Sequence, residues 1–398
     1  MIETLLADPR IVAAARRAHT GDAVAECLAR AAWTVIAEPG DAVAGALIEA
    51  LGAADALALA VGDPASLVPS GLGSASASRA LSDARSRWRP RAEASAVGDA
   101  LQAALDIGAQ LVIPGDEFWP KGLEDLGPGA PVALWVRGRV DLLCHEPRVS
   151  IVGARASSGY GEHMAAELAG DLAATGAAIV SGGAYGIDGA AHRAALGVGG
   201  KTIAFLAGGV DRAYPAGHQA LLRQIADEGA LVSEPPCGAA PTKWRFLARN
   251  RLIAALGQAT VVVEAGWRSG SLNTAGHAAA LGRPLGAVPG AVTSATSAGC
   301  HRLLREYDAQ CVTSAQEVRE LFEVLGGAPR AGQEDPDPHR ARILDAMSTR
   351  TRLPVEEIAR RAGLSPDRVR AILGLLHLDG DVAVDGEGWR RAPTPRRT

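Results

Sequence analysis

The chain has 398 residues, which is long enough for two or three domains. Hydrophobic residues make up 48% of it and the formal net charge is −4, so the composition excludes a disordered chain and a protein that binds nucleic acid through its overall charge. Any site for a polyanion must therefore come from a local cluster of basic residues.

The five cysteines are scattered and form no CxxC pair, which predicts reduced thiols in a cytoplasmic protein. Cys300, His301 and Cys311 resemble metal ligands but lack a fourth partner at the usual spacing, so no metal site is expected. The sequence shows no signal peptide, and no apolar run approaches the roughly 20 residues of a membrane span.

The first 85 residues are predicted to form a helical domain. Leu, Val and Ile recur at helical spacing in 23–37 and 41–51, and Glu38-Pro39-Gly40 separates the two segments. A loose stretch at 69–74 is followed by a further helix that carries several arginines.

From about residue 100 the pattern changes to short apolar runs that alternate with helix-length segments such as 162–175 and 189–196. The predicted strands are 111–113, 132–136, 149–152, 178–181, 202–206, 230–233, 260–263 and 285–288. Apolar strands separated by helices are typical of a parallel sheet that is covered on both faces. In such sheets ligands bind beyond the carboxyl ends of the strands.

Three segments, 149–155, 179–188 and 249–253, suggest a phosphate site at these ends. In the first two, an apolar strand breaks into glycine and enters a helix, which aims backbone N–H groups and a helix dipole at one place. Arg155, Arg249 and Arg251 would add charge-assisted hydrogen bonds. No GxGxxG with its ribose-binding acid and no GxxxxGK[ST] occurs, so NAD, FAD and Walker-type nucleotides are disfavoured and no cofactor is expected.

The C-terminal part begins with a linker at 326–338, which is rich in glycine, proline and acids. Residues 339–392 then show three helices and a hairpin, the pattern of a helix-turn-helix with a wing. Such a module either reads duplex DNA or docks a protein, and the sequence leaves both possibilities open.

Seven ordered motifs resemble the DNA-processing protein A family, also called DprA or Smf. They are Ser150–Arg155, Ser181–His192, Gly208–Pro215, Ser233–Pro235, Phe246–Arg251, Glu264–Leu272 and Ala287–Gly290. The resemblance covers about 110–320, and the helical front and the winged tail also match the layout of that family.

The resemblance implies an extended Rossmann-like, doubly wound, mostly parallel α/β sheet at 100–325. It also implies an N-terminal helical (SAM-like) domain at 1–85 and a C-terminal winged helix at 339–392. The implied function is non-enzymatic: the protein binds and protects incoming single-stranded DNA and loads the RecA recombinase in natural transformation. Homodimers are implied to form through the central domain.

The resemblance also assigns DNA-binding residues. They are Gly153, Arg155, Ser181, Gly182, Gly183, Arg212, Tyr214, Arg249, Asn250, Arg251, Ser269, Gly270 and Ser271. Whether Arg249 and Arg251 touch DNA or organise the pocket is left open. Tyr214 and Tyr185 are candidates for base stacking, although the aromatic content of 4% makes phosphate contacts the expected main contribution.

Other polar residues favour structural roles. Asp188 and Asp211 are expected to hold glycine turns, and His192 to be packed on a helix. Glu264 is expected to pair with Arg249 or Arg251, because a buried charge needs a partner, with a general acid–base role as the alternative. That alternative belongs to a rival interpretation, a nucleotide-processing phosphoribohydrolase-like enzyme. A third interpretation is a protein-binding adaptor.

Overall fold

The structure, a computed structural model, describes residues 1–19, 21–62, 75–326, 338–349, 351–378, 381–385 and 388–392. The chain divides into two compact units, 1–326 and 327–398. Most of the predicted linker, 327–337, and the predicted loose stretch at 69–74 lie outside the described residues. The finer division of the first unit at 85–100 stays a prediction. No described helix is long and apolar enough to cross a membrane.

Helices form the N-terminal part of the first unit, as predicted. They are α1 (Ile2–Ala7), α2 (Pro9–Ala18), α3 (Val24–Ile36), α4 (Ala42–Leu51), α5 (Ala53–Val61), α6 (Ala75–Trp88), the 3₁₀ turn η1 (Arg89–Arg91) and α7 (Ala94–Asp106). Asp41 starts α4, because its carboxylate accepts hydrogen bonds from the N–H groups of Val43 and Ala44.

A nine-stranded sheet follows, in the order β1-β2-β6-β5-β4-β3-β7-β8-β9. Its strands are β1 (Ala109–Val112), β2 (Leu134–Gly138), β3 (Arg148–Val152), β4 (Ala178–Ser181), β5 (Lys201–Leu206), β6 (Ala230–Ser233), β7 (Ala259–Val262), β8 (Leu285–Ala287) and β9 (Gln310–Cys311). Only the β1–β2 and β2–β6 pairs are antiparallel. The predicted mostly parallel α/β fold is confirmed. Strand β9 was missed because two exposed residues show no apolar run.

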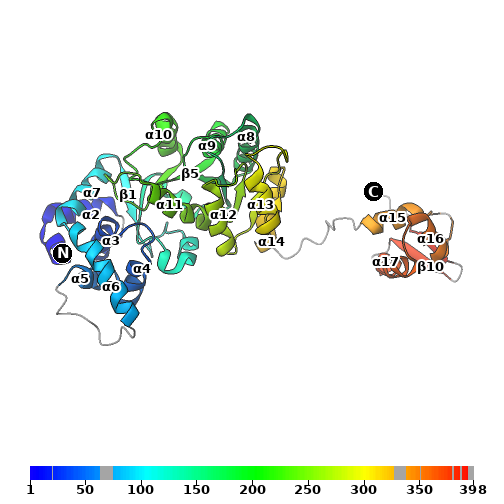
Figure 1. Ribbon diagram of the computed structural model, residues 1–398, viewed down its shortest axis with the longest axis horizontal. Helices are drawn as coiled ribbons and strands as arrows, with labels where there is room; N and C mark the ends of the chain where they lie inside the picture. The colour runs from blue at the N-terminus through cyan, green and yellow to red at the C-terminus, as the bar shows by residue number, and fades with distance from the viewer. Residues whose placement is uncertain are drawn as a thin grey trace. The chain divides into compact units, whose positions relative to one another are not determined.

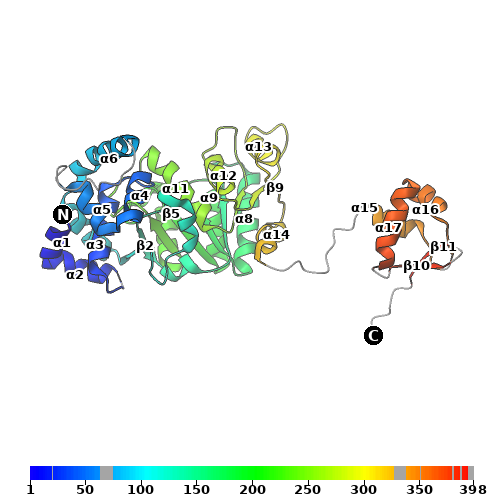
Figure 2. The ribbon, with the colours of Figure 1, turned by 90° about the horizontal axis from the view of Figure 1, so that it is seen from below.

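Helices cover both faces of this sheet (Figures 1 and 2). Val149 and Ile151 of β3 pack with α8 (Gly159–Ala174), α9 (Ile187–Gly197) and α14 (Ala315–Gly326), while Val152 packs on the opposite face. That face is covered by α11 (Lys243–Leu256), α12 (Ser271–Ala280) and α13 (Ala298–Glu306). Helix α10 (Gln219–Glu228) packs against β5 and β6. Burial on both faces explains why the strands are continuously apolar.

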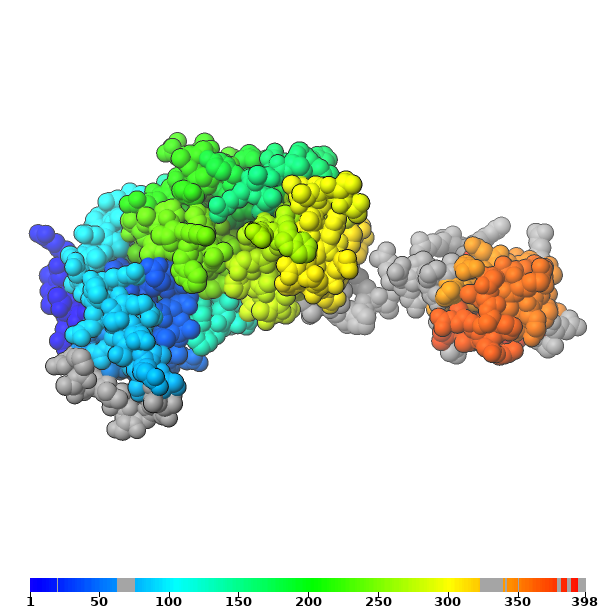
Figure 3. All heavy atoms as spheres, viewed as in Figure 1, coloured from blue at the N-terminus to red at the C-terminus, as the bar shows by residue number. Residues whose placement is uncertain are grey.

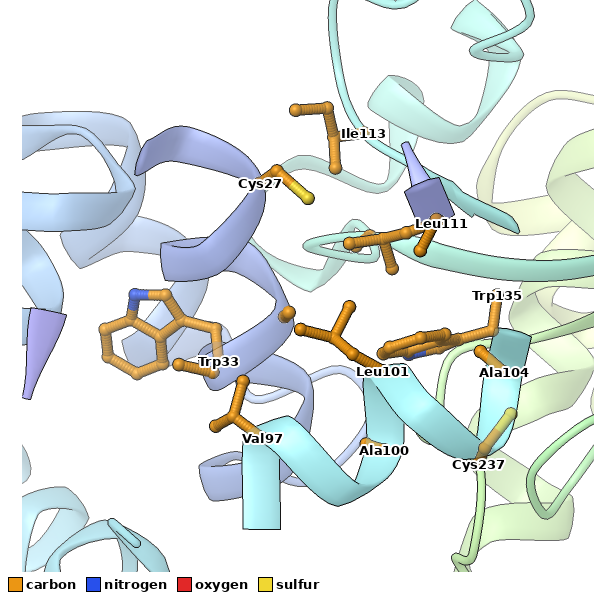
Figure 4. Packing of buried hydrophobic residues seen from close by; sticks show 14 of the residues in the cluster. Cys27, Trp33, Val97, Ala100, Leu101, Ala104, Leu111, Ile113, Trp135 and Cys237 are labelled. Carbon is orange, nitrogen blue, oxygen red and sulfur yellow. The ribbon is translucent and has the colours of Figure 1, made fainter. Parts of the chain in front are cut away.

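The N-terminal helices share a core with the β1–β2 end of the sheet. Trp33 of α3 and Trp88 pack edge to face at 5.1 Å, and the Trp135 indole N–H of β2 donates to the Thr34 hydroxyl at 3.3 Å. Figure 4 shows Leu101 of α7 and Leu111 of β1 in the same cluster. In Figure 3 the blue and cyan residues lie directly against the green part of the chain.

Strand β3 marks the place where the sheet changes direction. The chain runs from β3 through β4 and β5 to β6 on one side, and then returns to β7 on the other side of β3. The loops that follow β3 and β7 therefore diverge to opposite faces. In a doubly wound sheet this divergence opens a ligand crevice beyond the strand ends.

The second unit is a winged helix, as predicted. It contains α15 (Pro338–Ala346), α16 (Val355–Ala362), α17 (Pro366–Leu378) and the antiparallel hairpin β10 (Val382–Asp385) and β11 (Gly388–Arg391). Gly363 ends α16 in the left-handed conformation at φ 65°. Ile343, Ile358 and Leu373 form its small core.

Candidate functional site

A cavity of about 820 Å³ lies in this crevice, and we call it the basic pocket. Its walls come from the turn after β3, the starts of α9 and α11, and the loop between β7 and α12. Figure 1 shows α11 and α12 next to each other. Both helices contribute residues to the pocket lining. Four cations line the pocket, namely Arg155, Lys243, Arg249 and Arg268. The one acid in its lining is Asp188, so the pocket favours anions.

Arg155 is exposed at the pocket mouth, in the turn after β3. Its guanidinium carbon lies 4.7 Å from the ring centroid of Phe246, and the Tyr214 ring lies 5.4 Å from the same ring. The cation–π contact orients Arg155 without neutralising it. In the described part of the chain, no carboxylate pairs with Arg155, Lys243 or Arg268, so three cationic groups remain available to a ligand.

Arg249 lies at the floor of the pocket with only 5% of its surface exposed. Its guanidinium donates to the carbonyl of Phe205 at 2.8 Å, and its Nε is buried without a hydrogen-bond partner. Burial lowers the pKa of Arg249 to about 10, against the opposing effect of Asp188, so the group stays charged at neutral pH. A side chain at Gly182 would collide with this guanidinium, which explains the glycine there.

The glycine turn after β4 does not present its N–H groups to the pocket. Those of Gly182 and Ala184 donate to the Asp188 carboxylate at 3.1 and 3.4 Å, and that of Gly183 donates to His192 at 3.3 Å. The prediction that these groups face an external anion is therefore wrong. The turn binds a carboxylate of its own chain, and burial of that carboxylate raises the pKa of Asp188.

Ser181, Gly182 and Gly183 accordingly lie outside the pocket lining. Ser181 is fully buried and its hydroxyl donates to the carbonyl of Ile151 at 2.6 Å. Gly183 has a φ of 66°, a conformation that favours glycine. The three residues therefore shape the turn that supports Arg249 and Asp188.

Arg251 supports the fold and does not line the pocket, because its side chain points away from it. It donates to the Glu234 carboxylate at 2.8 Å and to the carbonyls of Gly129 and Ala248, and both charged side chains are less than 10% exposed. The N–H of Gly40 also donates to Glu234 at 3.2 Å. Glu234 thus links Arg251 of α11 to the helical region through the Gly40 N–H.

Glu264 does not pair with either arginine, so that prediction is wrong. Its carboxylate accepts hydrogen bonds from the N–H and hydroxyl of Ser158, both at 2.8 Å. Ser158 precedes α8, so Glu264 caps a helix start, where a negative charge is favoured by the helix dipole. It borders a separate cavity of about 530 Å³ and not the basic pocket.

Two further predicted residues lie outside the basic pocket. Arg212 is exposed, 3.9 Å from Asp211, and Asp211 in turn holds its loop by accepting from the N–H of Gly238. Tyr185 packs against His218 and accepts from the N–H of Gly217. Tyr214 does line the pocket, and 48% of its surface is exposed.

The remaining predicted residues lie in the pocket lining, with Gly153 in the turn after β3. Ser269 and Ser271 share a hydrogen bond of 2.8 Å at the start of α12. Asn250 donates to the carbonyl of Gly270 at 3.4 Å and to Asn273 at 3.2 Å, which joins α11 to this loop.

Lys243, Phe246 and Arg268 are pocket residues that the sequence analysis did not select. The available signal was Lys243 itself, one of only three lysines in the chain, beside a tryptophan and three residues before Phe246. Helical spacing over Lys243, Phe246 and Asn250 places all three on one side of α11. Arg268 likewise follows a tryptophan in a glycine-rich loop.

The cysteine and histidine residues considered as metal ligands or catalytic groups are packed or hydrogen-bonded within the fold. Cys300 is buried with its thiol against the carbonyl of Val262, and His301 bonds to the carbonyl of Gly290. His192 is packed as expected, with Nδ1 2.7 Å from the Thr202 hydroxyl. Within the described ranges no group of three or more metal-ligating side chains occurs.

Comparison with known proteins supplies an independent line of information. Residues 110–323 match a protein family described as DNA recombination-mediator protein A, and residues 327–388 match the DprA winged helix domain. A Mycobacterium tuberculosis protein, provisionally named DNA processing protein DprA, is 44% identical over 317 residues, which are 75% of this chain and 81% of that protein.

Two further proteins match a similar share of this chain. The Escherichia coli protein Smf is 38% identical over 300 residues, covering 72% of this chain and 79% of that protein. The X-ray structure of DNA processing protein A from Streptococcus pneumoniae aligns with a TM-score of 0.59 at 30% identity. It covers 75% of this chain and 97% of that one.

Proposed function

The chain belongs to the DNA recombination-mediator protein A family, and we propose that it binds single-stranded DNA in the basic pocket. The observation that carries the proposal is the set of unpaired cations, Arg155, Lys243 and Arg268, around an open cavity of about 820 Å³. Tyr214 and Phe246 add exposed or partly exposed rings beside them. A basic groove with aromatic faces is what single-strand binders combine.

Asp188 favours a polymer over a mononucleotide as the ligand. A terminal phosphate is commonly held by the N–H groups of a glycine turn. Here the N–H groups of Gly182 and Ala184 are already bonded to Asp188, and the cations that remain are side chains on the pocket walls. Separate cations spaced around a cavity suit successive phosphates of a strand.

The position of Glu264 disfavours the phosphoribohydrolase-like alternative. A general acid or base must reach the reacting group, but this carboxylate is bonded to Ser158 and lies outside the lining of the basic pocket. We therefore propose a binding protein without catalytic residues. Incubation with nucleoside monophosphates should release no free base, and release would favour the enzyme.

Family membership also supports three finer proposals. The bound strand would be handed to the RecA recombinase, the physiological setting would be natural transformation or related DNA recombination, and the protein would act as a homodimer. A strand-exchange assay with RecA and a molar-mass measurement in solution test the first and third. Failure to stimulate RecA loading, or a monomer at all concentrations, would contradict them.

Fluorescence anisotropy with labelled oligo-dT tests the binding proposal. Arg155→Ala and Lys243→Ala should each weaken binding about tenfold, because each removes a charged contact of about 1.4 kcal/mol. Arg223, an exposed arginine of α10 outside the pocket lining, provides the matched control, and Arg223→Ala should bind like the wild type. Wild-type affinity in both pocket variants would reject the site.

A further inference from the structure

Two tryptophans differ from the rest by their exposure. Trp244 is 67% exposed and Trp267 is 59% exposed, although the chain has only 4% aromatic residues. The other tryptophans of the first unit are at most 4% exposed, namely Trp33, Trp88, Trp119 and Trp135. An indole left in water forgoes the free energy of burying its apolar surface, and both rings keep an apolar face available to a partner.

Trp244 lies at the rim of the basic pocket, on the first turn of α11. Lys243 precedes it and lines the pocket, and Leu247, three residues later on the same side of the helix, lines it too. Leu247 is itself 38% exposed. Trp244 therefore adjoins the pocket lining in the chain, next to an unpaired cation, with its indole exposed.

Trp267 lies on a second wall, in the loop between β7 and α12. Gly266 and Arg268, its two neighbours in the chain, both line the pocket. The Arg302 guanidinium lies 5.2 Å from the indole centroid and is itself bonded to Glu306 at 2.7 Å. This cation–π contact fixes the ring while more than half of its surface stays exposed.

We propose that Trp244 and Trp267 are base-stacking platforms that extend the single-stranded DNA site beyond the basic pocket. The inference rests on the proposed function and deepens it. Each exposed ring adjoins a cation in sequence, Lys243 or Arg268, and a single strand presents the matching alternation of phosphate and open base face. Duplex DNA keeps its base faces stacked inside the helix and offers no such match.

The test compares labelled oligo-dT with an abasic oligodeoxynucleotide of the same length, which keeps the phosphates and lacks the bases. The full-length wild type should bind oligo-dT at least about tenfold more tightly than the abasic strand. Trp244→Ala and Trp267→Ala should each weaken oligo-dT binding about fivefold or more and leave abasic binding and the salt slope unchanged.

Phenylalanine variants separate stacking from bulk structure. Trp244→Phe and Trp267→Phe should retain most of the affinity for oligo-dT, while the double Phe variant loses most of the quenching of tryptophan fluorescence by DNA. Leu6→Ala, which changes an exposed apolar residue of α1, serves as the control and should behave like the wild type. Circular dichroism of each variant verifies that its fold is intact.

Each outcome has a distinct meaning. If the wild type binds oligo-dT and the abasic strand equally, the stacking role of the two tryptophans is wrong. The same follows if the double variant Trp244→Ala, Trp267→Ala binds oligo-dT like the wild type. Neither result would contradict binding in the basic pocket. Absence of wild-type binding to both strands would overturn the proposed function itself, and the platforms with it.

Discussion

Arg249 and Arg251 lie two residues apart on α11 and have different surroundings. Arg249 points to the floor of the basic pocket, where burial lowers its pKa, whereas Arg251 points to Glu234 and the helical region. Positions two apart on a helix face different sides, so one short motif supplies both a pocket cation and a structural ion pair. The sequence leaves open whether these arginines face a ligand or support the fold. In the structure Arg249 lines the pocket and Arg251 supports the fold.

Arg251→Ala should therefore destabilise the protein more than it affects the pocket. The substitution leaves Glu234 buried without its charged partner, a change that typically costs about 3–5 kcal/mol. Urea denaturation of the variant, with Arg223→Ala as the control, measures the loss in free energy of unfolding. A loss no larger than that of the control would contradict the structural role.

His192 makes the stability of the fold depend on pH. Burial, together with the nearby charges of His218, Arg249 and Arg193, lowers its pKa from 6.5 to about 3. Between these pH values the unfolded chain binds a proton that the folded chain does not. The free energy of unfolding should therefore fall as the pH drops through this window, by up to about 1.4 kcal/mol per pH unit from this group.

Denaturation of the wild type and of His192→Gln between pH 6.5 and pH 4 measures this effect. The variant has no imidazole to protonate, so its stability should fall less steeply than that of the wild type. Parallel curves for the two proteins would show that His192 makes no contribution.

At the level of elements, helix α11 joins the pocket to the helical region. Lys243, Phe246 and Asn250 face the pocket, while Arg245 donates to Glu38 at 2.9 Å on the side of the N-terminal helices. The Thr242 hydroxyl caps the helix by accepting from the N–H of Arg245 at 3.2 Å. The first turn of α11 is thereby held in the position that presents Lys243.

Thr242→Ala should fray this turn. Loss of the cap costs about 1 kcal/mol of stability, and the affinity for oligo-dT should fall because Lys243 and Phe246 lose their fixed positions. Thr242→Ser keeps a capping hydroxyl and should restore both. Equal behaviour of the Ala and Ser variants in denaturation and anisotropy would argue against the cap.

The sequence predicted the secondary-structure elements well and the partners of individual side chains less well. Apolar runs predicted eight strands and the sheet class, because burial on both faces leaves a direct signal in composition. The glycine turn after β4 was located and the role of Asp188 in holding it is confirmed, but the sequence did not show that Asp188 takes the N–H groups expected to face a ligand, because that depends on side-chain packing within the turn. The partner of Arg251 was missed for the same reason, since Glu234 lies 17 residues before Arg251 in the chain and is brought to it only by the fold.

At the scale of the whole molecule, the first unit contains the complete basic pocket. The helical region is fixed to the sheet by a shared core and by the contacts of Gly40 with Glu234 and of Glu38 with Arg245, while the pocket opens beyond the central strand ends. The winged helix forms a second unit with its own core.

The central claim is that single-stranded DNA is held by the cations of the basic pocket, and the salt dependence of oligo-dT binding tests it most directly. Each neutralised phosphate contributes about −0.7 to the slope of log affinity against log salt concentration. The triple variant Arg155→Ala, Lys243→Ala, Arg268→Ala should bind weakly, with a slope shallower than that of the wild type by about 2. A triple variant with the affinity and slope of the wild type would contradict the account.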